Sequence, residues 1–171
     1  PRQVKVPGVL VDAVVLATPA NTHLAIARQV LAAGKHTLVE KPLDVSLERA
    51  EELVRIAEAS KLCFGVVLQH RFRPGAVRLR VLLASGALGE LQAGMLQVPW
   101  WRSQAGYYAQ AGRGTRERDG GGVLLTQAIH SLDLFRSFVG VRKVVAAQVI
   151  TTALHSMETE DFVSALLTLG N

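Results

Sequence analysis

The sequence predicts a doubly wound α/β layer followed by an α+β domain. In the first half, three short apolar runs alternate with two helical patterns, as in parallel strands joined by crossover helices. In the second half, two strand-like runs follow each other with no helix between them, which is typical of an antiparallel sheet. The composition agrees, because 171 residues that are 49% hydrophobic and 19% charged are typical of a globular chain.

Each element of the first half has a local signal. The run 12–18 is apolar and β-branched, as expected of a strand buried on both faces of a parallel sheet. Gly34 stands where a helix commonly ends, and Ser46 stands where a side chain can cap the next helix. Strands are therefore expected over residues 12–18, 36–39 and 62–68, and helices over 22–33 and from Ser46 to Ala59.

The second half begins with a helix expected over residues 74–85, which ends at Gly86. The partly alternating run 91–100 predicts a long strand. Residues 101–119 form a polar loop rich in Gly and Arg, and loops of this length inside compact domains are usually functional or disordered. Two further strands are expected over residues 142–152 and 161–169.

Three consecutive glycines, residues 120–122, open an apolar helix that carries Thr126, His130 and Asp133. Glycines permit a close approach of the backbone to a ligand. The spacing of the three polar residues places them on one stripe of a helix, and the rest of its circumference is apolar, so the helix is expected to be buried. Because a buried histidine and a buried acid need partners, we expect this stripe to face a ligand.

Charge and composition exclude several classes of protein. The net charge is +5, but the arginines are scattered, with only a modest cluster over residues 113–118, so no nucleic-acid partner is expected. A basic surface also suits a cofactor that carries phosphate. The single Cys63 allows no disulfide framework, which favours a cytoplasmic location. No apolar stretch reaches the ~20 residues of a membrane helix, so no membrane partner is expected.

Four motifs resemble, in order and spacing, those of the Gfo/Idh/MocA oxidoreductases, and the likeness runs over nearly the whole chain. They are Ala17-Thr18-Pro19-Ala20-Asn21-Thr22-His23, Ala33-Gly34-Lys35-His36, Glu40-Lys41-Pro42-Leu43, and Gly120-Gly121-Gly122 with His130 and Asp133. The resemblance implies part of a Rossmann domain over residues 1–70 that binds NAD or NADP. It also implies part of a C-terminal domain over residues 71–171 with a mostly antiparallel open sheet. That domain would bind a small sugar-like substrate and mediate homo-oligomerisation.

The chain departs from the family pattern at its start. The glycine fingerprint G-x-G-x-x-G, which holds the pyrophosphate in the first βα turn, is absent. The chain also begins with Pro1 and ends on what resembles an unfinished strand, residues 166–170. We therefore expect an internal portion of a longer protein, without the fingerprint segment and the C-terminal end.

Hydride transfer requires a group that moves the hydroxyl proton and a charge that polarises the oxygen. The resemblance assigns these catalytic roles to His130 and Lys41. Many family members have an acid four residues before the histidine, where this chain has Thr126, and Asp133 is a candidate to orient the imidazole instead. Substrate-binding candidates are Thr126, Asp133 and Arg113; cofactor-binding candidates are Thr18, Pro19, Asn21, His23, Glu40, Lys41 and Gln69; no metal site is expected.

Structural alternatives remain for these residues. Lys41 can be a solvated strand end, and His130 can be a core histidine paired with Asp133. Arg113 can contact either cofactor phosphate or substrate. The aromatic residues Trp100, Trp101, Tyr107 and Tyr108 can form a wall on which a sugar stacks, a core or a subunit interface.

Two functions follow from the sequence. The first is an NAD(P)-dependent dehydrogenase or reductase that acts on the CH–OH group of a sugar, polyol or related hydroxy/keto compound. The second is a non-catalytic ligand-binding or scaffold protein on the same fold, because Thr126 replaces the acid and the fingerprint is missing. A glycosidase that uses a tightly held NAD is a third, minor interpretation.

Overall fold

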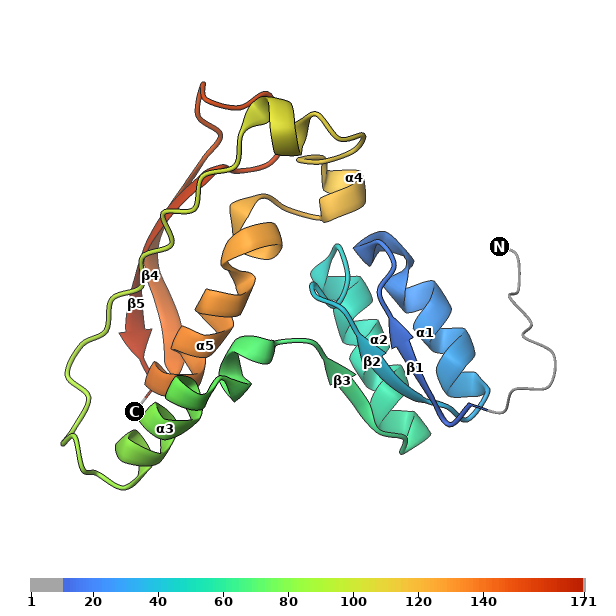
Figure 1. Cartoon of the computed structure of the whole chain (residues 1–171), viewed down its shortest axis with the longest axis horizontal. Coiled ribbons are helices and arrows are strands. Elements are labelled where there is room, and N and C mark those ends of the chain that lie inside the picture. The colour runs from blue at the N-terminus through green and yellow to red at the C-terminus, as the bar shows by residue number, and fades with distance from the viewer. Residues whose placement is uncertain (1–10, 171) are drawn as a thin grey trace.

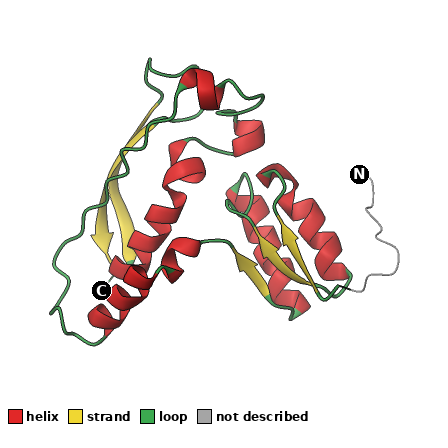
Figure 2. Ribbon diagram, viewed as in Figure 1, coloured by secondary structure: helices red, strands yellow, loops and turns green. Residues whose placement is uncertain are grey.

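The computed structural model describes residues 11–170, so the first ten residues of the predicted domain 1–70, and Asn171, lie outside the described residues. Figures 1 and 2 show a parallel α/β layer beside a second part that contains helices, a long irregular segment and an antiparallel strand pair. The main elements are β1 (Ala13–Leu16), α1 (His23–Ala32), β2 (His36–Val39), α2 (Leu47–Ser60), β3 (Phe64–Val66), α3 (Pro74–Ala84), α4 (Arg116–Asp119), α5 (Ile129–Val139), β4 (Val141–Ile150) and β5 (Phe162–Leu169). Four short helical segments complete the chain: the 3₁₀ turns η1 (Ala20–Thr22) and η2 (Gln69–Phe72), and the π-helical turns η3 (Gln104–Tyr108) and η4 (Leu124–Ala128).

The first half is a parallel sheet with the strand order β1-β2-β3, which confirms the α/β class. The expected burial on both faces is wrong for the described residues, because the side chains of Val15 and Leu38 are 64% and 42% exposed. Helices α1 and α2 both pack on the same face of the sheet, and do not cover one face each. The strands follow one another in chain order, and right-handed crossovers that advance in one direction place their helices on the same side. The core between helices and sheet consists of Leu16, Leu24, Ala27, Leu31, Val39, Leu53 and Ala57.

A buried carboxylate fixes the loop that follows β2. Asp44 accepts hydrogen bonds from the backbone N–H of Leu24 at 3.1 Å and from Nε of Arg49 at 2.5 Å. It thereby ties the start of α1 to the first turn of α2, whose predicted cap is confirmed, since the Ser46 side chain accepts from the N–H of Arg49 at 3.4 Å. This anchoring matters for the site, because the anchored loop carries Lys41.

The second half contains an antiparallel pair, β4 and β5, as predicted. The predicted strand over residues 91–100 is wrong. This segment has no ladder partner in the described part of the chain, and Met95 is 82% exposed. Alternating hydrophobicity indicates an extended chain, but a strand forms only where a neighbour takes its N–H and C=O groups. Exposed apolar side chains lie on both strands of the pair. The homo-oligomeric contact expected through this sheet stays a prediction.

Two glycines of the run 120–122, Gly120 and Gly122, lie against protein backbone. Gly120, with φ +74°, ends α4, and a Cβ there would lie 2.5 Å from the carbonyl oxygen of Val45. A Cβ on Gly122 would lie 1.8 Å from the carbonyl oxygen of Glu160. Gly120 and Gly122 thus let the loop after β2 and the segment before β5 approach the start of η4, and the expected close approach to a ligand stays a prediction.

Within residues 11–170, no helix is long and apolar enough to cross a membrane.

Candidate active site

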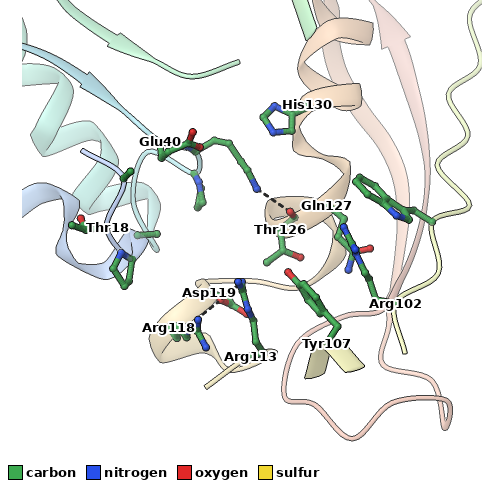
Figure 3. Close-up of a pocket in the computed structure, with 16 residues that line it drawn as sticks. Thr18, Glu40, Arg102, Tyr107, Arg113, Arg118, Asp119, Thr126, Gln127 and His130 are labelled. Atoms are coloured by element: carbon green, nitrogen blue, oxygen red, sulfur yellow. Dashed lines mark hydrogen bonds and ion pairs between the residues drawn. The ribbon is translucent and has the colours of Figure 1, made fainter. Parts of the chain in front are cut away.

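A cavity of about 510 Å³ lies between the carboxyl ends of β1 and β2 and the part of the chain around η3, α4 and η4 (Figure 3). The carboxyl edge is where parallel sheets bind ligands, since the loops after the strands converge there. The cavity is lined by Ala17, Thr18, Pro19, Ala20, Glu40, Lys41, Pro42, Trp100, Arg102, Tyr107, Arg113, Arg118, Asp119, Thr126, Gln127 and His130.

Lys41 crosses the cavity from the end of β2. Its Nζ donates to the backbone carbonyl of Thr126 in η4 at 2.9 Å, as Figure 3 shows. Burial lowers the pKa of Lys41, and the positive charges of Arg113 and Arg102 lower it further, against the opposing effect of Glu40. An ammonium group has three donors, so two remain to bind an oxygen atom in the cavity.

His130 faces the same cavity from the first turn of α5. Its Nδ1 atom is buried and has no hydrogen-bond partner among the described residues. Its ring lies against that of His70, with 4.9 Å between the centroids. Burial lowers the pKa of His130, and Lys41 and His70 lower it further. The neutral imidazole, which can accept a proton, is therefore the favoured form near neutral pH.

The expected pairing of Asp133 with His130 is wrong. The Asp133 carboxylate accepts from Nε of Arg71 at 2.6 Å and from a second guanidinium nitrogen of the same residue. Asp133 lies outside the residues that line the cavity, so its predicted substrate-binding role gains no support from its position. The predicted stripe holds in part, since Thr126 and His130 both line the cavity, whereas Asp133, three residues further along α5, is held by Arg71 outside it.

Thr126 lines the cavity but does not hold the His130 ring. Its hydroxyl donates to the carbonyl oxygen of Gly122, four residues earlier in the chain, at 2.7 Å. Its backbone carbonyl, not its side chain, is the group that contacts Lys41. This position, where many family members carry an acid, therefore contributes a main-chain acceptor.

The predicted cofactor-binding residues divide into two groups. Thr18, Pro19, Glu40 and Lys41 line the cavity. The three others, Asn21, His23 and Gln69, do not line it. His23 is 1% exposed, and its ring nitrogens lie within hydrogen-bond distance of the carbonyls of Thr18, Pro42 and Leu43. The His23 ring therefore connects the two loops that carry Thr18 and Lys41.

The aromatic residues and the loop over residues 101–119 complete the opposite wall. Trp100 and Tyr107 line the main cavity, whereas Trp101 lines a smaller cavity of about 140 Å³ behind it. Arg102, Arg118, Asp119 and Gln127 also line the main cavity, and the sequence did not single them out. Two features of the sequence could have indicated these residues: the length and polarity of the loop, and the positions of Arg102 and Arg113 a few residues after aromatic residues in the sequence.

Comparison with protein families agrees with this geometry. Residues 3–68 match the model of the oxidoreductase family with an NAD-binding Rossmann fold. Residues 76–171 match the model of the GFO/IDH/MocA C-terminal domain. A Rossmann-like sheet edge that faces a C-terminal domain across a cavity defines the class of two-domain dinucleotide oxidoreductases. The chain belongs to the Gfo/Idh/MocA family.

The individual relatives share only moderate sequence identity with this chain. The chain is 28% identical to inositol 2-dehydrogenase of Rhizobium meliloti over 161 residues, which is 92% of this chain and 46% of that protein. It is 29% identical to D-xylose dehydrogenase of Paenarthrobacter nicotinovorans, over 82% of this chain and 37% of that protein. The structure resembles that of the WlbA dehydrogenase of Bordetella pertussis in complex with NADH and UDP-GlcNAcA. The TM-score is 0.85 at 33% identity, and the match covers 92% of this chain and 45% of that one. The chain thus spans less than half the length of these relatives.

Proposed function

We propose that this chain carries the active site of an NAD(P)-dependent oxidoreductase that transfers a hydride to or from a sugar, polyol or related hydroxy/keto compound. The observation that supports this most directly is the joint presence of Lys41 and His130 in one cavity at the carboxyl edge of the parallel sheet. The named activities of the two dehydrogenase relatives support the substrate class.

The described residues fit one end of the cofactor. Thr18, Pro19 and Glu40 follow β1 and β2, where a nicotinamide ring has a polar wall and room for a small substrate beside it. Within residues 11–170, β1 is followed by Thr18-Pro19 and η1, and no glycine-rich βα turn is available for the pyrophosphate. When bound, the nicotinamide accepts or supplies the hydride. The chain's own residues hold the substrate oxygen and its proton.

Lys41 and His130 divide this work. The Lys41 ammonium, held by the Thr126 carbonyl, hydrogen-bonds the reacting oxygen and favours negative charge on it. The neutral His130 accepts the hydroxyl proton when an alcohol is oxidised and returns it when a carbonyl is reduced. Among the described residues no carboxylate orients the His130 ring, which is the observation that favours a non-catalytic binding protein as the second candidate.

A turnover panel separates the two candidates. The full-length protein is mixed with NAD⁺ or NADP⁺ and with myo-inositol, D-xylose and sugar acids, and the appearance of the reduced nicotinamide is followed by absorbance. We expect turnover with at least one of these compounds. Binding of a panel compound without turnover would support the non-catalytic candidate instead.

The pH dependence of kcat/KM is expected to reflect both lowered pKa values. Because His130 must be neutral to accept a proton, the acidic limb should lie below about 6.5, the ordinary histidine pKa. The basic limb reports the loss of charge on Lys41. The variant Arg113→Gln removes a positive charge that lowers the pKa of Lys41, so its basic limb should move to higher pH. Measured pH profiles of the wild type and the variant decide the point, and a limb that stays in place or moves to lower pH contradicts it.

A further inference from the structure

The lining of the cavity carries an excess of positive charge. The cationic side chains in the lining are Lys41, Arg102, Arg113 and Arg118, and the acidic ones are Glu40 and Asp119. Asp119 is shared, since it lies 3.5 Å from Arg113 and 4.0 Å from Arg118 and also accepts from the N–H of Gly114 at 2.8 Å. Arg102 forms no ion pair with any described residue. The cavity therefore holds cations that its own acids do not neutralise.

Two of these arginines have a buried donor without an acceptor. The Nε atoms of Arg102 and Arg113 are both buried, and neither has a hydrogen-bond partner among residues 11–170. A buried donor on a charged group that has no acceptor is costly. Both side chains also line the same cavity, where an anion would balance their charge.

Aromatic rings hold the two guanidinium groups by their faces. The central carbon of Arg102 lies 4.3 Å from the ring centre of Trp100 and 5.0 Å from that of Tyr107, and that of Arg113 lies 4.9 Å from Tyr107. Such contacts stabilise the positive charge but use none of the N–H donors, which lie in the guanidinium plane. A guanidinium that is fixed in this way presents its donors in the planar fork that suits a carboxylate.

The backbone of Arg102 is also fixed from behind. Nε2 of His155 lies 2.8 Å from the carbonyl oxygen of Arg102, and Nδ1 lies 2.7 Å from the carboxylate of Asp161. Burial disfavours the charged ring, but the hydrogen bonds to Asp161 and Arg102 outweigh it and raise the pKa of His155. The Asp161 carboxylate and the Arg102 carbonyl can only accept hydrogen bonds. The imidazolium form of His155, which carries an N–H on each ring nitrogen, therefore satisfies both. Arg102 is thus held in place before any ligand arrives, which favours binding.

We propose that Arg102 and Arg113 form a subsite for a carboxylate on the substrate, so that the enzyme acts on an acidic sugar. The proposal rests on the proposed function, because it assigns the substrate of that same site. A phosphate of the dinucleotide offers the same chemistry. Arg102 lies against Trp100 and Tyr107, whereas Arg113 pairs with Asp119 of α4, which packs against η1 after β1. Titration with and without NADH therefore has to separate a substrate carboxylate from a cofactor phosphate.

Calorimetric titration tests this without turnover. The full-length protein, with and without saturating NADH, is titrated with D-glucuronate and with D-glucuronamide, which has the same shape without the charge. We expect glucuronate to bind at least about tenfold more tightly, as charge-assisted hydrogen bonds provide. The variants Arg102→Gln and Arg113→Gln should each lose most of this preference, whereas Arg136→Gln, exposed on α5 and outside the cavity lining, should keep it.

The outcomes are separable. Glucuronate that binds no better than the amide, or does not bind, overturns the proposal, even if neutral sugars are turned over and the proposed function stands. Loss of NADH affinity in the two variants with an unchanged preference for glucuronate assigns the arginines to the cofactor and also overturns it. A preference for glucuronate that disappears in both variants, in a protein that turns nothing over, supports the subsite and contradicts only the proposed function.

Discussion

Replacement of Lys41 by methionine is expected to lower kcat by about 10²–10⁴-fold, the range for loss of one group that stabilises charge or moves a proton in the transition state. Methionine keeps an unbranched chain of similar length but removes the charge and the donors. The lost bond to the Thr126 carbonyl is half-buried and worth about 1 kcal/mol, so the fold should persist. Affinity for the dinucleotide should change little, because the lysine acts on the substrate oxygen.

The measurement combines steady-state kinetics with titration of NAD(P)H fluorescence. Lys143→Met is the matched control, because Lys143 is exposed on β4 and lies outside the cavity lining. It removes the same charge from the same chain and should leave kcat unaltered. An undiminished kcat in Lys41→Met would contradict the proposal that this lysine hydrogen-bonds the reacting oxygen. A loss of dinucleotide binding as large as the loss of turnover would place Lys41 on the cofactor.

The elements with strong local signals could be predicted from the sequence. Helix α2 has a cap at Ser46 and a regular apolar face, and the parallel and antiparallel strand groups fall where the patterns placed them. The failures concern features that depend on distant segments. The run 91–100 is irregular because no neighbouring strand pairs with it, and the exposure of Val15 depends on the side on which both crossovers lie. Neither fact is contained in a local pattern.

The candidate site divides in the same way. Lys41, His130 and Thr18 belong to motifs, and the structure places them in one cavity. Arg102 and Asp119 belong to no motif, and reach the cavity only because the loop 101–119 folds back through η3 and α4. The partner of Asp133 was misassigned for a related reason. Arg71, which binds the Asp133 carboxylate, is 62 residues away in sequence, so helical spacing alone could not identify it as the partner.

Replacement of Gly122 by alanine is expected to lower the free energy of unfolding by about 3 kcal/mol, the upper part of the range for overpacking. The new Cβ would lie 1.8 Å from the carbonyl oxygen of Glu160 and 2.7 Å from its carbonyl carbon and its nitrogen. These are backbone atoms, which cannot rotate aside as a side chain can. The shift needed would also disturb the bond from the Gly122 N–H to the Glu160 carboxylate at 2.9 Å, just before η4.

Thermal unfolding measures the effect, and about 3 kcal/mol corresponds to a loss of roughly 6–12 °C in Tm for a chain of this size. Gly75→Ala is the control, because Gly75 lies in α3 with no atom within 4 Å of a new Cβ. Alanine is favoured over glycine in helices, so that variant should gain about 0.5–1 kcal/mol. Gly121→Ala should fall between them, because its nearest contact, at 2.9 Å, is the flexible side chain of Leu125.

The same variant decides between two explanations of the glycine run. If its glycines serve backbone packing, Gly122→Ala loses stability whether or not ligand is present, and its turnover falls because η4 carries the Thr126 carbonyl that holds Lys41. If they serve a ligand, the variant keeps its Tm and loses only affinity. An unchanged Tm with weakened ligand binding would therefore restore the interpretation that the sequence suggested and overturn the one drawn from the contacts of Glu160 with this helix.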